Sequence, residues 1–272
     1  MKKILANAVL VVFFLILFAA SHALANVAVV GSLTRQSTVE PGQKVDGSIV
    51  LRNNGSDPVE IKVEQCDYLF YADGRTDYAR PGGNPRSNAG WMAVAPARLV
   101  IPPNEVGFVY YTIRVPNDPE LKGTYWSIIM VEPVPSTSPE SIRAKEGNYV
   151  LGVQTVLRYG IQVITNVGTT GAKNVKILNR KLERGQDGTC TLLLDLENTG
   201  EQMITPEVRA EVYDREGRLV GTFKGTRKRI YPTTSVRYAI PFEGLAKGRY
   251  RILVVIDDGD SAVWGAQYSV EL

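Results

Sequence analysis

The stretch that decides the fold is GTYWSIIMVEP, which runs from Gly123 to Pro133. Side chains of a strand alternate between its two faces, so Trp126 and Ile128 share one face while Tyr125 and Ile129 share the other. Both faces are therefore apolar, although the hydrophobic content of the whole chain is only 44%. The open question is what covers each face, and we expect Trp126 to lie in the core of its own domain.

The rest of the chain has the same strand-like texture. Short apolar segments are separated by Gly, Pro, Asn and Asp, and long stretches with a period of 3.6 residues are absent. Segments of this kind are IVLRNNG, VEIKV, GFVYYTIRV, TLLLDLENTG, EVRAEVY and YRILVVI. Closely spaced strands with turn signals between them predict an all-β protein built from antiparallel, immunoglobulin-like sandwiches.

An internal repeat predicts two domains of similar design. The segments 39–75 and 182–218 each contain a Gly-Gln turn, an alternating strand and a turn of the form Asn-x-Gly, followed by a second strand that ends in tyrosine. Asn and Gly tolerate positive φ, so they mark corners of the chain. The small residues of 165–171 are suited to a linker. We therefore expect domain 1 at residues 26–166 and domain 2 at residues 171–272.

Domain 1 is longer than an ordinary immunoglobulin-like domain because of two segments. Residues 72–90 are rich in Gly, Pro, Arg and Asn, and residues 133–148 contain several prolines and charges. Neither segment has a strand pattern. We expect both to be exposed and mobile loops.

The first residues have the features of a secretory signal. Lys2 and Lys3 precede an apolar run from Ile4 to Ala20, and small residues follow up to Ala25. This pattern predicts a signal peptide at residues 1–25 that is removed after Ala25, which places the mature protein in the periplasm or another extracytoplasmic space. The alternative is a retained membrane anchor, because the apolar run is nearly long enough to span a bilayer.

Composition excludes several classes of chemistry. The only histidine is His22, so the mature chain has none, and mechanisms that need histidine as a base or a zinc ligand are excluded. Without Lys2 and Lys3 the 31 basic residues become 29, against 28 acidic ones, which gives no electrostatic argument for nucleic acid. Cys66 and Cys190 fall in different predicted domains, so we expect two separate thiols rather than a disulfide. We expect no cofactor and no metal site.

Two charged segments have simple structural interpretations. The basic run KGTRKRIYP (residues 224–232) is typical of a solvated strand edge, although it would also suit lipid phosphate or an acidic partner. The acidic segment DDGDS (residues 257–261) lacks the spacing of a calcium loop and is interpreted as a hairpin turn.

The order of features around the opening stretch resembles a known family. Trp91 starts a strand, ARLVIPPNE and FVYYTIRVP follow, and then come GTYWSIIMVEP and a long strand from Tyr149 to Ile164. Upstream, SLTRQSTVEPGQ (residues 32–43) looks like a first strand and turn. This order resembles the N-terminal domain of the periplasmic pilus chaperones, the PapD-like family. The resemblance covers most of domain 1 and is architectural in domain 2.

The resemblance implies a function for the last strand of domain 1. In this family that strand lends alternating apolar side chains to a client subunit that lacks a strand, which is strand addition to an open sheet. Here the corresponding residues are Tyr149, Leu151, Val153 and Thr155. The alternative is that they are ordinary core residues beneath a loop.

The resemblance also implies a site for the C-terminal carboxylate of the client. The family holds this group with two basic residues in the cleft between the domains. The first position is occupied here by Ser37, with Arg35 two residues earlier on the same face of the predicted strand. Arg158 is the candidate for the second position. Two cations that converge on a carboxylate make strong charge-assisted hydrogen bonds.

Two classes of function follow. The first is a periplasmic chaperone that binds secreted or fimbrial subunits by strand addition at the edge of domain 1 and at the cleft. The second is an extracytoplasmic adhesion module that binds cell wall, glycan or a surface protein. An enzyme is not expected, because no nucleophile motif, paired carboxylates or phosphate loop stands out.

Overall fold

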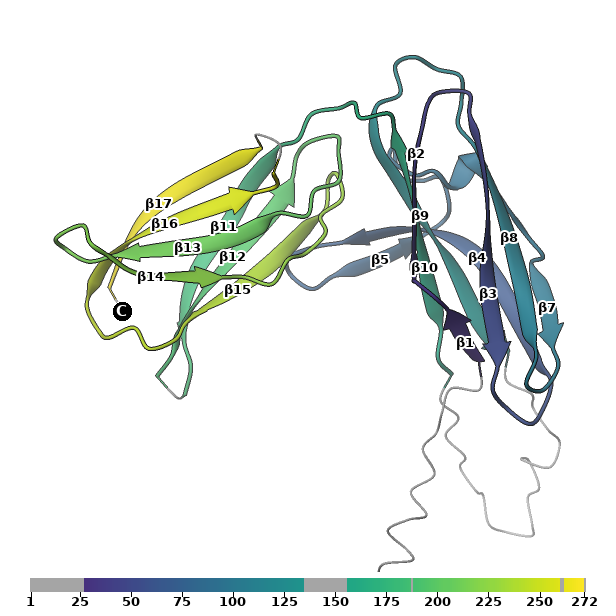
Figure 1. Ribbon diagram of the computed structural model, residues 1–272, viewed down its shortest axis with the longest axis horizontal. Coiled ribbons are helices and arrows are strands. Elements are labelled where there is room, and N and C mark those ends of the chain that lie inside the picture. Colours follow the sequence, from purple (N-terminus) through teal and green to yellow (C-terminus); the bar gives the residue numbers. More distant parts are fainter. Residues whose placement is uncertain (1–26, 135–155, 187, 260–261, 272) are drawn as a thin grey trace, which may run out of the picture.

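The structure is a computed structural model that describes residues 27–134, 156–186, 188–259 and 262–271. Within these ranges the chain forms two β-sandwiches that meet at an angle (Figure 1). The prediction of an all-β protein is confirmed, since the single helical element among the described residues is one short 3-10 turn at Ala89–Trp91. No helix in the described ranges is long and apolar enough to cross a membrane.

The first sandwich contains two sheets. One has the strand order β1-β3-β8-β6, and the other has the order β2-β10-β9-β4-β5, with β7 also paired to β4. The strands are β1 (Val27–Val30), β2 (Thr34–Val39), β3 (Lys44–Asn53), β4 (Val59–Phe70), β5 (Thr76–Ala79), β6 (Met92–Ala95), β7 (Arg98–Ile101), β8 (Val106–Arg114), β9 (Gly123–Val134) and β10 (Tyr159–Val167).

The second sandwich also contains two sheets. Their strand orders are β11-β12-β15 and β14-β13-β16-β17. The strands are β11 (Val175–Arg184), β12 (Cys190–Asn198), β13 (Glu207–Tyr213), β14 (Leu219–Lys224), β15 (Ser235–Phe242), β16 (Arg249–Asp257) and β17 (Val263–Glu271). β16 and β17 form the hairpin that the segment at 257–261 predicted.

Alternating apolar residues build the core of each sandwich. In β13 (EVRAEVY), Val208, Ala210 and Val212 are buried while the residues between them are partly exposed. In β8, Val109 and Ile113 are buried in the same alternating way. One side chain in two therefore points between the sheets, as expected for strands with a single covered face.

The repeated Asn-x-Gly turns have the same structural role in both sandwiches. Asn53 and Asn198 are fully buried, and each accepts a hydrogen bond from the N–H of the glycine two residues later. Their side-chain amides donate to carbonyls far along the chain, at Ile101 (3.0 Å) and Ile230 (2.9 Å) respectively. Buried polar groups need such partners, so each asparagine fixes a loop corner to a neighbouring segment.

Among its described strands, the first sandwich contains one parallel pair in an otherwise antiparallel arrangement. β2 runs parallel to β10, with Thr34 opposite Gln162 and Val39 opposite Val167. The chain thus leaves β1 in one sheet and enters the other sheet at β2. The N-terminal segment is therefore part of both sheets of this sandwich.

The expectation of an exposed segment holds for most of residues 72–86, but the expectation that residues 72–90 form no strand is wrong. This segment contains the strand β5 and then folds back over the buried carboxylate of Asp67. That carboxylate accepts hydrogen bonds from the N–H of Gly82 (3.0 Å), the N–H of Asn84 (2.7 Å) and the hydroxyl of Ser87. One buried acceptor with three donors orders a segment whose composition is typical of a loop.

Candidate functional site

The second sandwich covers the outer face of β9 at Trp126. Trp126 is fully buried, and its indole ring stacks on the phenol ring of Tyr231 with 4.7 Å between centroids and 8° between planes. Ile164 completes the buried cluster, and the indole N–H of Trp126 donates to the carbonyl of Tyr68 at 2.7 Å. The expectation that Trp126 lies in the core of domain 1 is therefore wrong, because that core takes the other face of β9.

The two faces of β9 thus bury into different surroundings. Tyr125, Ile129 and Val131 belong to the core of the first sandwich, whereas Trp126 faces domain 2. Further along the outer face, Ile128 is also buried. A Cβ on its neighbour Gly160 would lie 2.5 Å from the Ile128 Cδ1, so glycine at 160 makes room for this side chain.

A loop of domain 2 is hydrogen bonded to the start of β9. The N–H of Thr124 donates to the carbonyl of Glu201 at 2.8 Å, and the N–H of Met203 donates to the Thr124 hydroxyl at 2.9 Å. Gly123 has φ +79°, and a Cβ there would lie 2.2 Å from the Glu201 carbonyl oxygen. Only glycine permits this approach of two backbones from different sandwiches.

Ion pairs surround the same contact. The carboxylate of Glu201 lies 3.4 Å from the guanidinium of Arg86 and 3.5 Å from the ammonium of Lys122, both in domain 1. The backbone N–H of Ala172 holds the pKa of Glu201 below its usual value, and Lys122 and Arg86 act in the same direction. Glu201, a residue of domain 2, is therefore bonded both to the linker and to domain 1.

Arg229 reaches from domain 2 to the first strands of domain 1. Its Nη1 lies 3.2 Å from the side-chain oxygen of Gln162 and 3.4 Å from the hydroxyl of Thr34. Its Nε is buried without a hydrogen-bond acceptor, and no carboxylate in the described chain forms an ion pair with it. The hydroxyl of Tyr231 donates to the same Gln162 oxygen, and burial raises the pKa of Tyr231 to about 12.

β10 has a backbone edge that β2 covers only in part. β2 pairs with residues 162–167 of β10, and the first bond of this pairing runs from the N–H of Gln162 to the carbonyl of Leu33. Tyr159, Gly160 and Ile161 pair with β9 on the other side. Among the described residues, no strand pairs with the β2 side of β10 at these three positions. The free edge therefore begins where Arg229 meets Gln162.

The structure does not bring Arg35 and Arg158 together. Arg35 lies opposite Val163 in the parallel pair, and Val163 and Val39 on that face belong to the core, so Arg35 is on the opposite face from Gln162. Its guanidinium donates to the carbonyl of Ser32 at 2.6 Å. Arg158 precedes Val163 by five residues, which is about 16 Å along a strand.

Arg158 also has a partner of its own. Its guanidinium lies 3.0 Å from the carboxylate of Glu132, and about half of its side chain is exposed. Ser37 lies opposite Thr165 on the inner face of the pair, as Arg35 does. The other predicted site residues lie outside the described residues; they are Tyr149, Leu151, Val153 and Thr155.

Arg229 is the residue that the sequence did not single out. It belongs to the basic run at 224–232, which was interpreted as a solvated strand edge, and Lys224 at the end of β14 fits that interpretation. The chain then turns inward, because the buried Ile230 forms an isolated bridge with Ile204 and is followed by the buried Tyr231. The sequence did contain a sign of this inward turn, because Ile230 and Tyr231 directly follow Arg229.

Cys66 and Cys190 are free thiols in different sandwiches, as expected. Burial raises the pKa of Cys66, and the nearby carboxylate of Glu64 acts in the same direction. Both effects disfavour the thiolate, so Cys66 is not an activated nucleophile.

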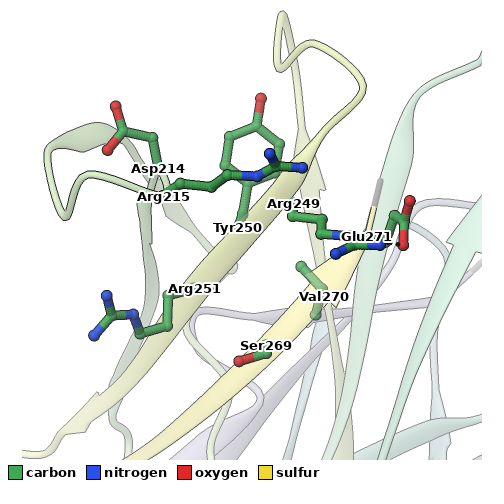
Figure 2. A pocket seen from close by; sticks show the side chains of 8 residues that line it. All are labelled: Asp214, Arg215, Arg249, Tyr250, Arg251, Ser269, Val270 and Glu271. Atoms are coloured by element: carbon green, nitrogen blue, oxygen red, sulfur yellow. Dashed lines mark hydrogen bonds and ion pairs between the residues drawn. The ribbon is translucent and has the colours of Figure 1, made fainter.

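A separate groove of about 410 Å³ lies at the end of β16 and β17 in domain 2 (Figure 2). Its lining includes Arg215, Arg249 and Arg251, and Arg249 lies 3.4 Å from Glu271. In Figure 2 the side chain of Arg251 points away from that of Arg249. The charged groups therefore do not converge on one point, and the groove has no residue in common with the junction between the sandwiches.

The fold and the junction define a protein of two immunoglobulin-like sandwiches held at a fixed corner. No family model and no curated protein matches the chain. Among solved structures, it is similar to a chaperone–tip adhesin complex of CFA/I fimbriae, with 10% identity, a TM-score of 0.49 and coverage of 90% of this chain and 98% of that chain. The class 5 fimbriae chaperone CfaA gives 12% identity, a TM-score of 0.46 and coverage of 90% and 98%.

Another match is the chaperone–tip subunit complex CsuC–CsuE of Acinetobacter baumannii, with 12% identity, a TM-score of 0.44 and coverage of 91% of this chain and 98% of that chain. The PapD-like domain 7 of human CEP192 covers 55% of this chain and 95% of its own length, with 16% identity and a TM-score of 0.35. The likeness to these structures is one of overall layout.

Proposed function

We propose that this chain is a periplasmic chaperone that binds secreted or fimbrial subunits by strand addition at the free edge of β10. The observation that carries the proposal is the partial cover of β10, whose backbone is paired to β2 only from Gln162 onward. A client strand paired with residues 159–161 of β10 would continue this sheet edge beyond the start of β2. The predicted signal peptide and the similarity to pilus chaperones support the same compartment and class of client.

The backbone of β10 is suited to accept such a strand. Since the N–H of Gln162 points toward β2, the N–H and C=O of Gly160 point to the same side, whereas those of Ile161 point toward β9. Gly160 therefore offers an unpaired donor and acceptor. Main-chain hydrogen bonds of this kind supply the affinity in strand addition, and side chains supply the register.

We further propose that the terminal carboxylate of the client binds at Arg229. Arg229 is at the point where the free edge meets β2, and its Nε is buried without an acceptor. The guanidinium of Arg229 has only neutral hydrogen-bond partners in the described chain, so a client carboxylate would supply its charge-assisted hydrogen bond. Arg158 is paired with Glu132 and directly precedes β10, where it would contact the body of the client strand.

The edge hypothesis is tested by removing one N–H. Gly160→Pro deletes the free donor without removing a bond to β9, while Gly160→Ala introduces the same close contact with Ile128 and keeps the N–H. Each variant is co-expressed with a fimbrial subunit that the wild-type chain binds, chosen by screening secreted subunits. The one-to-one complex is then quantified by size-exclusion chromatography.

We expect Gly160→Ala to form the complex at nearly the wild-type level and Gly160→Pro to form at least tenfold less. Equal complex formation by both variants would exclude strand addition at this edge. If the wild-type chain binds none of these subunits, the chaperone function is wrong. The adhesion-module hypothesis would then be preferred.

A further inference from the structure

The edge strands of domain 2 differ in how they are protected from pairing with another chain. β11 has a register shift between Ile177 and Asn179 and carries several lysines and arginines. β15 contains Pro241, and Lys228 donates to its Arg237 carbonyl at 2.5 Å. Charges, proline, irregular register and a covering segment are the usual means of blocking a sheet edge.

β14 is protected in the same way. It is six residues long, its register against β13 shifts next to Val212, and it ends in Lys224. A short, irregular strand with a terminal lysine offers little to a second chain. Of the four edge strands that the structure describes in domain 2, three are therefore protected.

β17 lacks proline and an irregular register, and its one charged side chain is that of Glu271 at its end. It pairs with β16 over nine residues in continuous register, from Val263 opposite Asp257 to Glu271 opposite Arg249. Its sequence, VWGAQYSVE, contains no lysine, arginine or proline. Figure 1 shows it at the outer edge of its sheet, and no other described strand pairs with it.

The hairpin shows which backbone groups of β17 are free. The N–H of Asp258 donates to the carbonyl of Ala262 at 3.0 Å, so residue 262 and every second residue after it point their backbone groups toward β16. The remaining residues direct their N–H and C=O groups to the open side. They are Val263, Gly265, Gln267, Ser269 and Glu271.

These residues are complementary to a second copy of the same strand. If two β17 strands lie antiparallel about a two-fold axis at Gln267, Gln267 faces its own copy, Gly265 faces Ser269 and Val263 faces Glu271. No two like charges are then opposite each other, and two glutamine side chains meet at the axis. A two-fold contact has to be self-complementary in this way.

The residues on the inner face of β17 are also complementary to those of the second copy. In the same register, Trp264 is opposite Val270 and Ala266 is opposite Tyr268. Trp264, Tyr268 and Val270 pack against the core of domain 2 but remain partly exposed along this edge. Cross-strand pairs of aromatic and aliphatic residues stabilise antiparallel sheets, so the second copy would cover apolar surface that is now at the rim.

We propose that domain 2 forms a two-fold homodimer through β17, in which the two sheets join into one continuous sheet centred on Gln267. About ten interchain backbone hydrogen bonds form in this register. The contact does not use β10, so it is compatible with a client bound to domain 1. The dimer is weak, because a paired edge is smaller than an interface of standard size.

Sedimentation velocity of the mature chain tests the proposal. We expect the wild-type chain to be substantially dimeric at a concentration on the order of 100 μM, in the range where small interfaces become populated. Gln267→Pro removes the central N–H from each copy without touching the bonds to β16, and should raise the dimer Kd about tenfold or more. Gln267→Ala keeps the N–H and should remain dimeric.

A charge exchange tests the two-fold register itself and does not depend on a proline. Gln267→Lys and Gln267→Glu each place like charges at the axis, so each alone should be several-fold weaker than the wild type. An equimolar mixture of the two should recover a dimer of mixed composition. Because Gln267 is exposed, all four variants should keep the wild-type Tm.

Three outcomes would overturn the proposal. The first is a wild-type chain that stays monomeric at this concentration. The second is a dimer that Gln267→Pro leaves unchanged, since that dimer must use another surface. The third is a mixture of the Lys and Glu variants that dimerises no better than either variant alone.

Discussion

The ring of Trp126 stacks on the ring of Tyr231, although the two residues belong to different sandwiches and are more than a hundred positions apart in the sequence. Both rings are buried, and the Tyr231 hydroxyl is tied to Gln162. The stack therefore fixes the position of domain 2 against the outer face of β9. It also explains why the outer face of this strand is apolar at Trp126.

Truncation of Trp126 should loosen the junction and leave the core of domain 1 assembled. Burial of an aromatic ring predicts that Trp126→Ala lowers the free energy of unfolding by about 3–5 kcal/mol. A double-mutant cycle with Tyr231→Ala should give a coupling of about 0.5–1.5 kcal/mol, which is typical of paired aromatic rings. Urea unfolding of the four proteins measures both values. A coupling near zero would show that the two rings do not support each other.

A side chain at Gly123 should separate the domains. Gly123→Ala adds a Cβ that would overlap the Glu201 carbonyl, in a backbone conformation with positive φ. Gly74 also has positive φ, but nothing lies within 4 Å of its Cβ position, so Gly74→Ala measures the backbone strain alone. The strain is about 1–2 kcal/mol in both variants. We expect a clearly lower Tm for Gly123→Ala, and similar values for the two variants would contradict the close approach at the junction.

Stability should fall at alkaline pH through the buried tyrosines. Burial raises the pKa of Tyr231 and of Tyr238 to about 12, whereas an unfolded chain has a tyrosine pKa of about 10. Between these values the unfolded state releases protons that the folded state retains, so the free energy of unfolding decreases as the pH rises from about 10 to about 12. Each tyrosine contributes about 1.4 kcal/mol per pH unit. Urea unfolding in that range should give a slope that is smaller by about 1.4 kcal/mol per pH unit for Tyr231→Phe than for the wild type, and an unchanged slope would contradict the raised pKa.

Arg229 should contribute to client binding more than Arg158. Loss of one member of a hydrogen-bonded charge pair at an interface costs about 2–5 kcal/mol of binding. Arg229→Ala should therefore weaken the client complex by at least thirtyfold. Arg158→Ala should have a smaller effect, because it breaks only the ion pair between an exposed arginine and Glu132. Isothermal titration with a client whose C-terminus is amidated is the control, because amidation should remove the difference between the wild-type chain and Arg229→Ala. A larger effect of Arg158→Ala would restore the hypothesis that Arg158 is the anchor.

The strand character of the chain was predictable because it depends on local spacing. The alternation in β13 and the two apolar faces of β9 can be read from neighbouring residues, and the similar surroundings of Asn53 and Asn198 follow from the internal repeat. The first two signals come from neighbouring residues, and the third comes from a comparison of two distant segments of the chain.

The candidate site was less predictable because its members come from distant segments. The residue that stacks on Trp126 depends on how domain 2 docks against domain 1. The sequence around Trp126 would be the same whether this residue lay in a domain core or at the junction between the domains. Arg229 has the same chemistry as the solvated arginines beside it and differs in the turn that the chain makes at Ile230. Arg35 was assigned to the site because it lies in a segment that resembles the first strand of the chaperone family. In the parallel register with β10, however, it lies on the face opposite that of Gln162.

The parallel pairing of β2 with β10 also has a consequence for how the protein assembles. β2 is synthesised near the beginning of domain 1, but its partner is the last strand of that domain, more than a hundred residues later. A contact of such long range closes slowly, because the intervening chain loses entropy before the pairing compensates for it. β2 can therefore pair with β10 only when the sandwich is nearly complete. Until then, the whole edge of β10 is available to any extended peptide nearby.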